Sequence, residues 1–380
     1  MLFVEVYISG LLLAFLVAYY YIEYKKISSI KRTIRIKIAV TGSRGKSTTV
    51  RFLCSVFRKA GYRVLGKVTG TKPLLILPDG RIQEIKRKGP VSILEQKKVL
   101  LKKAQQIKPD VLITEIMSIN PEYQRSESKL LITPDYYLIT NIKRDHIGVT
   151  GGNKKEIAEV FLKSAPINSN VLALESERHL LEQFKNVSSN ISFIKDNEDT
   201  LNQKLEKLQP GFGRIILFAR HMCKELGLNE NIIPEALSEY QFDSHIFSIK
   251  KLSKQVTAVN AFNANDVDSS YEIFNNIKKD YRDYKKVGVF CTRKDRPERT
   301  KSWIESLQKD PWEFDSVFVY GPHFLPVKKR KYPFPVKKIE EPNLKTFFNR
   351  EEKTLFFGFG NYVQSGELIV NIWNEMGDQT

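Results

Sequence analysis

Eight consecutive residues near the N-terminus are typical of a phosphate-binding loop. They read Thr41-Gly42-Ser43-Arg44-Gly45-Lys46-Ser47-Thr48 and lie between a predicted buried strand, 34–40, and a predicted helix, 46–60. Glycines let a backbone approach phosphate, and a helix N-terminus offers free N–H groups. Lys46 would neutralise the β- and γ-phosphates of a nucleotide, and the Ser47 hydroxyl would bind Mg²⁺. Val40 replaces the first glycine of the full P-loop pattern, so only the shorter Gly-x-x-Gly-Lys-Ser form is present.

Two further polar segments follow predicted strands. Glu115 ends the strand predicted at 111–116, and Asn141, Asp145 and His146 follow the strand predicted at 136–141. Because ligands gather at the carboxyl ends of parallel strands, we expect these side chains to lie beside the phosphate loop. Glu115 could hold Mg²⁺ there, with His146 near it or at a second metal. Taken singly, a strand-end Glu or a lone His is more often a solvated residue, but three such segments favour one shared site.

A fourth polar segment opens the second half of the chain. It contains Asn260, Asn263, Asn265 and Asp266, between a predicted strand and a predicted helix. These residues could cap the helix and do nothing more. They could also contact a nucleotide bound between domains. The residues themselves leave both interpretations open.

The elements that must position these residues alternate between strands and helices. This alternation predicts an α/β fold with a mostly parallel sheet. The pattern restarts near residues 240–255, so we predict an ATP-binding central domain at 34–245 and a smaller C-terminal α/β domain at 246–380. Within the first domain, Ser92 and Glu95 have the spacing of a capping box, and Asn153 with Glu156 predicts a further helix start. Residues 322–335 are predicted to form an exposed loop.

The N-terminus predicts a single membrane-spanning helix within residues 1–24. Residues 6–22 are almost wholly apolar, tyrosines at positions 19–21 and 24 lie at the end of this stretch, and the positive charges come afterwards. The positive-inside rule then places the body of the chain in the cytoplasm and makes it a single-pass protein of the cell membrane. We expect residues 23–33 to form a short basic linker. The alternative is an ordinary buried helix.

The composition of the chain limits which kinds of molecule it is expected to bind. The chain has 380 residues, 42% of them hydrophobic and 27% charged, which is ordinary for a globular protein. Three cysteines, far apart, suggest neither a disulfide framework nor a zinc site. The net charge of +18 indicates acidic partners, although solubility or a lipid-facing patch would also account for it. No nucleic-acid-binding signature is present, so nucleic acid is not predicted as a partner.

In order and spacing, the four segments resemble those of the ATP-dependent Mur ligases. Further segments are similar to the ligase subunit of poly-γ-glutamate synthases, the CapB/PgsB family. These are Lys67-Val-Thr-Gly-Thr71, Gly89-Pro-x-Ser-Ile-x-Glu-Gln96, Ile119-Asn-Pro-Glu-Tyr-Gln124, Glu156-Ile-Ala-Glu159, Cys291-Thr-Arg-x-Asp-Arg296 and Gly358-Phe-Gly-Asn361. A membrane span directly before the ATPase domain is also like that family. The resemblance covers nearly the whole chain.

The resemblance implies an enzyme that uses ATP and Mg²⁺ to activate a carboxylate as an acyl phosphate and then joins it to glutamate. Poly-γ-glutamate would be the product, and other membrane subunits of the synthase would be partners. Catalytic roles then fall to Lys46, Glu115 and His146, and metal binding to Ser47, Glu115 and His146. The nucleotide would contact residues 41–48, Asn141, Asn263, Asn265 and Asp266. Two alternatives stay open: a Mur-like ligase for another carboxylate, and a non-catalytic, nucleotide-gated membrane scaffold.

Two departures from the Mur pattern are visible. Many Mur ligases carry a carbamylated lysine after the Asp-His pair, where this chain has Leu162, with Lys163 one residue away. The arginine that usually precedes the second domain is missing from residues 242–247, and Arg293 or Arg296 could replace it.

A growing polyanion also needs a basic path, for which we expect Lys67, Arg87, Lys88 or the cluster Lys328–Lys331.

Overall fold

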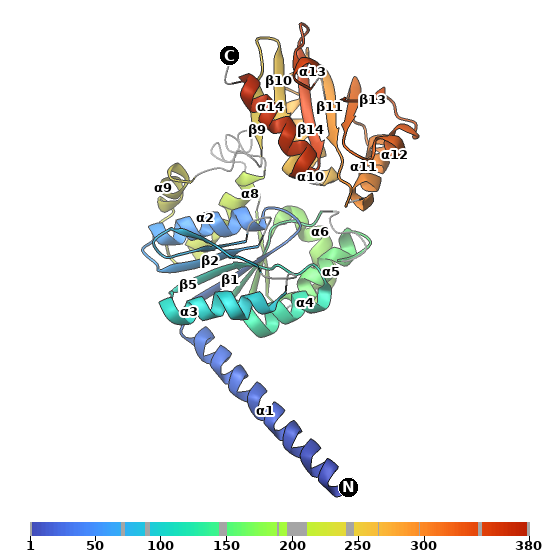
Figure 1. The fold of residues 1–380 in the computed structure, drawn as a ribbon. Coiled ribbons are helices and arrows are strands. Elements are labelled where there is room, and N and C mark those ends of the chain that lie inside the picture. Colours follow the sequence, from blue (N-terminus) through green and yellow to red (C-terminus); the bar gives the residue numbers. More distant parts are fainter. Residues whose placement is uncertain are drawn as a thin grey trace. The chain divides into compact units, whose positions relative to one another are not determined.

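A computed structural model describes residues 2–69, 73–87, 92–143, 150–187, 190–195, 211–240, 247–264, 266–295, 297–340 and 344–377. These residues divide into two compact units. The first lies within Met1–Glu198 and Arg214–Tyr240, and the second within Asp199–Gly213 and Gln241–Thr380. Each unit is built on its own sheet (Figure 1).

The first unit contains an eight-stranded sheet with the order β4-β3-β2-β5-β1-β6-β7-β8. In the sheet order from β2 to β8 all neighbouring strands pair parallel, whereas β3 pairs antiparallel with both β2 and β4. The predicted α/β class with a mostly parallel sheet is confirmed. The strands are β1 (Ile36–Thr41), β2 (Val64–Val68), β3 (Leu74–Ile76), β4 (Ile82–Glu84), β5 (Val111–Glu115), β6 (Tyr136–Ile139), β7 (Asn170–Leu174) and β8 (Ile191–Ile194).

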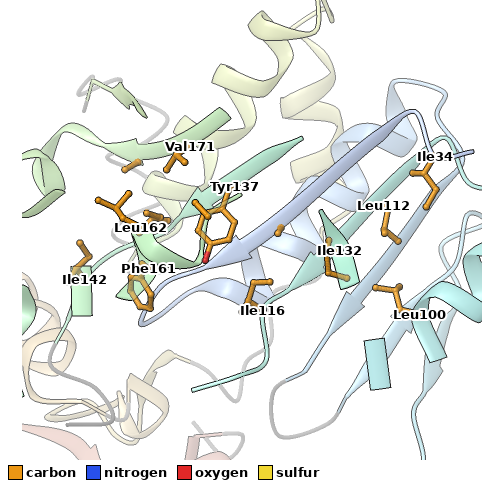
Figure 2. Packing of buried hydrophobic residues seen from close by; sticks show 14 of the residues in the cluster. Ile34, Leu100, Leu112, Ile116, Ile132, Tyr137, Ile142, Phe161, Leu162 and Val171 are labelled. Atoms are coloured by element: carbon orange, nitrogen blue, oxygen red, sulfur yellow. The ribbon is translucent and has the colours of Figure 1, made fainter. Parts of the chain in front are cut away.

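Helices cover both faces of this sheet. Because successive side chains of a strand point to opposite faces, every second residue packs against the helices on the same side. On one face Ala39, Leu112 and Tyr137 belong to a core cluster with Phe161 and Leu162 (Figure 2). On α2, the residues Val50, Leu53, Cys54 and Phe57 are buried at helical spacing. The helices in this part of the chain are α1 (Leu2–Arg32), α2 (Lys46–Lys59), η1 (Gln96–Leu101), α3 (Lys102–Ile107), α4 (Pro121–Ser126), η2 (Glu127–Ile132), α5 (Lys154–Ser164), η3 (Glu175–Glu177), α6 (Arg178–Leu181), η4 (Glu182–Val187), α8 (Phe212–Glu225) and α9 (Ile232–Ser238).

The N-terminal helix α1 continues without a break to Arg32, so the predicted linker at 23–33 is wrong. The physical reason is a second apolar stripe: Ile27 and Ile30, three residues apart on the helix, pack on the core of the first unit, and Ile34 just after the helix does the same. Before this stripe, α1 is long and apolar enough to cross a membrane, with a mean hydropathy of 1.6 and an unburied surface. One helix thus combines an exposed apolar stretch with a packed C-terminal end.

Two other local predictions are wrong. Ser92 and Glu95 do not form a capping box, because the Ser92 hydroxyl accepts from Leu94 N at 3.3 Å and the Glu95 carboxylate pairs with basic side chains instead. The loop predicted at 322–335 contains the helix α12, whose Val327 is buried, although Lys328–Lys331 are exposed as expected.

The cap predicted for α5 is confirmed. Asn153 Oδ1 accepts from Glu156 N at 3.0 Å, and Glu156 Oε1 accepts from Asn153 Nδ2 at 2.6 Å. These two bonds satisfy polar groups at the start of a helix whose Ile157 and Phe161 enter the core.

The second unit has a six-stranded sheet with the order β13-β12-β11-β14-β10-β9, parallel except for β9. Aromatic rings fill its core, among them Phe274, Trp303, Trp312 and Phe359. The strands are β9 (Ser248–Lys251), β10 (Val256–Asn260), β11 (Lys285–Cys291), β12 (Ser316–Tyr320), β13 (Val336–Lys338) and β14 (Thr354–Gly360). The helices are η5 (Phe262–Ala264), α10 (Val267–Ile277), α11 (Pro297–Lys309), α12 (Phe324–Lys328), α13 (Leu344–Phe348), η7 (Tyr362–Gly366) and α14 (Glu367–Gly377).

Candidate active site

The glycine-rich loop joins β1 to α2 at the centre of the first sheet. Gly42 has φ 126° and Gly45, which caps α2, has φ 79°, both values that favour glycine. A Cβ at Gly42 would lie 2.1 Å from Thr140 Oγ1 and 2.9 Å from Thr140 N. The loop therefore packs directly on the end of β6, and residue 42 must be glycine for that approach.

Asn141 fixes the conformation of this loop through hydrogen bonds to its backbone. Its Oδ1 accepts from Arg44 N at 3.0 Å, its Nδ2 donates to Arg44 O at 3.0 Å, and its carbonyl accepts from Ser43 N at 3.0 Å. Ser43 Oγ also exchanges hydrogen bonds with the backbone of Lys143. Both ends of the Asn141 amide are thus used by the loop backbone, and the nucleotide contact predicted for Asn141 stays a prediction.

Lys46, Ser47 and Glu115 converge at the carboxyl edge of the sheet. Because β1 and β5 are adjacent and parallel, with Val40 opposite Glu115, the Glu115 carboxylate faces the first turn of α2. Its Oε2 accepts from Ser47 Oγ at 2.7 Å and from Thr69 N at 2.9 Å. Lys46 Nζ donates to the carbonyls of Gly42 at 2.7 Å and Ser43 at 3.3 Å. The ammonium thus lies over the loop that would receive the phosphates.

The donor chemistry at this edge fits Mg²⁺. A carboxylate and a hydroxyl oxygen are hard ligands, and Mg²⁺ usually takes one or two protein oxygens together with phosphate and water. Within the described residues, no cluster of three or more His, Cys, Asp or Glu side chains could hold a metal ion. Ser47 and Glu115 are the described residues that would hold the ion, together with phosphate oxygens and water.

The remaining predicted site residues are placed as follows. Thr41 ends β1, and Thr48 is half-buried in the first turn of α2. Asp266 caps α10, its Oδ1 accepting from Ser269 N at 2.8 Å, so the helix-cap interpretation holds for this residue. Asn263 lies in η5 of the second unit. His146 and Asn265, together with Arg144, Asp145, Lys88 and Arg296, lie outside the described residues.

A pocket opens beside the loop within the first unit. One side is polar and comes from the loop: Thr41, Gly42, Ser43 and Lys46. The other side is mostly apolar and comes from the segment after β5 and from α4 and α5, with Thr150. It is lined by Ile116, Met117, Ser118, Ile119, Gln124, Thr150, Ile157 and Phe161. A ligand here would place an anionic end on the loop and a less polar part against this wall.

Behind the same strand end lies a buried polar network that the sequence did not predict. Glu127 is 0% exposed, and its carboxylate accepts from Met117 N at 3.0 Å, Ser118 N at 3.0 Å, Ser118 Oγ at 2.7 Å and Gln96 Nε2 at 2.5 Å. Gln96 Nε2 also donates to Glu115 O at 3.3 Å. Burial raises the pKa of Glu127. The network fixes the backbone that follows Glu115.

Lys67 supplies the positive charge of this network. It is 0% exposed and its Nζ pairs with Glu95 at 2.9 Å, while Glu95 also accepts from Arg87 Nε at 2.6 Å. Burial lowers the pKa of Lys67. Burial acts to raise the pKa of Glu95, but the bonds from Arg87 and Lys67 bring it below its ordinary value. A side chain enclosed in this way faces no polymer, so the polymer-binding role predicted for Lys67 is wrong.

The departure from the Mur pattern on α5 has a clear structural form. Leu162 is fully buried in the core cluster (Figure 2), and Lys163 pairs with Glu159 at 2.6 Å on the helix surface. Arg293, one of the two candidates to replace the missing arginine, donates from Nη2 to Asp295 at 2.9 Å. The position that carries the modified lysine in many Mur ligases is therefore a packing position here.

Comparison with known proteins agrees with this architecture. The MurF ligase of Thermotoga maritima, solved in complex with ADP, aligns over 93% of this chain and 84% of that chain with a TM-score of 0.62 at 15% identity. Residues 40–214 match the Mur ligase middle domain. The fold and the phosphate loop thus define a Mur-ligase-like protein.

The particular family follows from closer relatives. Residues 246–376 match the poly-gamma-glutamate synthase CapB C-terminal domain. The chain is 29% identical over 314 residues to the capsule biosynthesis protein CapB of Bacillus anthracis, covering 80% of this chain and 67% of that protein. It is 26% identical over 354 residues to the PGA synthase CapB of Bacillus subtilis (strain 168), covering 88% and 89%. Together these matches support the CapB family within the Mur-ligase superfamily.

Proposed function

We propose that this chain is an ATP-dependent amide ligase that makes poly-γ-glutamate. The observation that carries the proposal is the convergence of Lys46, Ser47 and Glu115 on one sheet edge, in a chain of the CapB family. A phosphate loop with a metal-binding carboxylate beside it suits phosphoryl transfer to a second anion.

The proposed reaction has two steps. An oxygen of the carboxylate substrate attacks the γ-phosphorus of ATP, and ADP leaves. The glutamate amine then attacks the acyl carbon and loses a proton, and phosphate leaves as the amide forms. In the first step two anions must approach each other, and fixed positive charge stabilises the transition state. When bound, Mg²⁺ would screen the phosphate charge.

Each residue of the site has a proposed part in this reaction. Lys46 moves from the loop carbonyls to the β- and γ-phosphates, and Ser47 with Glu115 holds the metal. His146 contributes to the same metal or to a second one. Asn263, Asn265 and Asp266 of the second unit contact the nucleotide. The apolar wall of the pocket, with Ile116 and Phe161, limits water near the acyl phosphate, which water would otherwise hydrolyse.

We further propose that α1 spans the cell membrane once and that both units lie on the cytoplasmic side. The apolar stretch of α1 and the basic residues after it support this orientation. One span forms no export path alone, so other membrane subunits would complete the synthase. The exposed cluster Lys328–Lys331 is the proposed contact for the acidic polymer.

The test is to supply the full chain, with and without its membrane partners, with ATP, Mg²⁺ and glutamate. We expect glutamate-stimulated release of ADP, a hydroxamate when hydroxylamine traps the acyl phosphate, and γ-linked polymer from the complete complex. Amide formation only with another carboxylate or amine would overturn the polyglutamate assignment and keep the ligase. Absence of any trapped acyl phosphate, with every carboxylate tried, would overturn the ligase and favour a nucleotide-gated scaffold.

A further inference from the structure

The first unit is joined to the proposed membrane span without a linker. Ile22 is the last residue of the apolar stretch, and the carboxylate of the next residue, Glu23, pairs with Lys97 of η1. Further along α1, Lys31 Nζ donates to Leu130 O of η2 at 2.9 Å. Because the helix rises about 1.5 Å per residue, Glu23 lies within the lipid headgroup layer if residues before it span the bilayer.

The surface of η1 and α3 beside this junction is basic, and an exposed apolar residue precedes η1. Leu94 is 45% exposed, and Lys98 and Lys102 are also exposed. Leu94 and Lys98 flank Lys97, the residue that Glu23 holds. Figure 1 shows α3 and α4 on the face of the sheet from which α1 departs, with α2 on the opposite face. The residues Leu94, Lys98 and Lys102 are called the junction patch below.

We propose that the junction patch contacts the anionic surface of the membrane, with Leu94 among the headgroups and Lys98 and Lys102 against lipid phosphates. Lysine stems lie along apolar material while the ammonium reaches phosphate, which suits the boundary between headgroup and acyl chain. Each lysine close to an anionic leaflet contributes attraction that falls off within a Debye length. The ion pair between Glu23 and Lys97 holds the patch within that distance. This inference rests on the proposed span.

Spin labels on single added cysteines test it in the full-length chain, reconstituted alone in lipid nanodiscs. The native Cys54, Cys223 and Cys291 are all buried, and burial raises the pKa of Cys54 to about 12, so these thiols react slowly. Three variants are compared: Leu94→Cys in the junction patch, Leu12→Cys in α1, and Glu235→Cys, exposed on α9, which packs on α2 across the sheet.

Accessibility of each label to oxygen, which enters lipid, and to an aqueous nickel chelate gives its depth. We expect the Leu12→Cys label in the hydrocarbon, the Leu94→Cys label in the headgroup layer and the Glu235→Cys label in water. Replacing anionic with neutral lipid should move only the Leu94→Cys label toward water, and Lys98→Glu with Lys102→Glu should do the same in anionic lipid.

The outcomes separate the two proposals. A Leu94→Cys label as accessible to nickel as Glu235→Cys, with Leu12→Cys in lipid, would overturn the membrane contact and keep the span. A Leu12→Cys label in water would overturn the span itself. Protection of the Leu94→Cys label only when partner subunits are added would also overturn the lipid contact and assign the patch to a protein.

Discussion

Two polar clusters lie on opposite sides of the strand end that carries Glu115, and they differ in burial. The front cluster, Lys46 with Ser47 and Glu115, bonds to loop carbonyls and to itself, and Lys46 and Ser47 are half-buried. The back cluster, Lys67 with Glu127 and its partners, is enclosed. Similar residue types therefore have different uses. Side chains of the front cluster can exchange their present hydrogen bonds for bonds to phosphate and metal. Side chains of the back cluster have no other partners to which they could turn.

The energetic reason is desolvation. A charge taken out of water is tolerated only while its partners stay in place, and removal of one partner leaves the other charge buried alone. A half-buried lysine can leave one acceptor for another at small cost because water completes its solvation. The comparison predicts that changes in the back cluster cost stability, and that changes in the front cluster cost activity.

The largest loss of stability is expected for Lys67→Met, which keeps the shape of the side chain and removes its charge. The free energy of unfolding should fall by about 3–5 kcal/mol, because Glu95 and Glu127 lose their buried cation. Urea unfolding followed by far-UV circular dichroism measures this. Lys59→Met is the matched control, since the surface pair of Lys59 with Glu239 should contribute only about 0–1 kcal/mol. Equal, small losses in both variants would remove the distinction between the clusters.

The reverse pattern is expected for Lys46→Ala. ADP formation should fall by about 10²–10³-fold or more, the loss seen when one preorganised electrostatic group is removed from a transition state. Unfolding in urea should match the wild type, because the Lys46 side chain packs in no core. Lys59→Ala, at the other end of the same helix, is the control for activity. Wild-type turnover by a folded Lys46→Ala protein would show that this loop does not serve the reaction.

Glu127→Gln sharpens the comparison, since Glu127 belongs to the back cluster but holds the segment next to Glu115. Glutamine offers one acceptor oxygen and an NH₂ group that faces other donors, so a buried N–H loses its partner at a cost of about 1–3 kcal/mol. The Mg²⁺ concentration for half-maximal activity should rise as well, because Glu115 loses its fixed backbone. Glu122→Gln, on exposed α4, should change neither quantity. Unchanged Mg²⁺ dependence in a destabilised Glu127→Gln protein would reduce the network to a purely structural role.

Much of the front cluster could be predicted because its signals are local. A strand, glycines and a lysine at a helix start specify the phosphate loop within eight residues. The meeting of Ser47 and Glu115 required one further rule, that carboxyl ends of parallel strands share an edge. The structure brings these two residues together as that rule predicts.

The back cluster could not be predicted in the same way, because its members come from separate elements. Lys67 stands on β2, Glu95 precedes η1 and Glu127 begins η2, and only the tertiary fold joins them. Apart from the family-like segments that contain Lys67, Glu95 and Gln96, its one sequence signal is a lysine in the otherwise apolar strand Val64–Val68. The local pattern was also misleading, since the spacing of Ser92 and Glu95 fits a cap while Glu95 is used in the ion pair.

The crowded aromatic core of the second unit has a spectroscopic consequence. All three tryptophans of the chain, Trp303, Trp312 and Trp373, are buried there, and Trp312 stacks on Phe314 with ring centroids 5.3 Å apart. The first unit, which contains the phosphate loop, therefore has no tryptophan of its own to contribute to the emission. Intrinsic tryptophan emission reports on the surroundings of the tryptophans in the C-terminal half. Any change in emission on adding nucleotide would therefore mean that the environment of these side chains has changed.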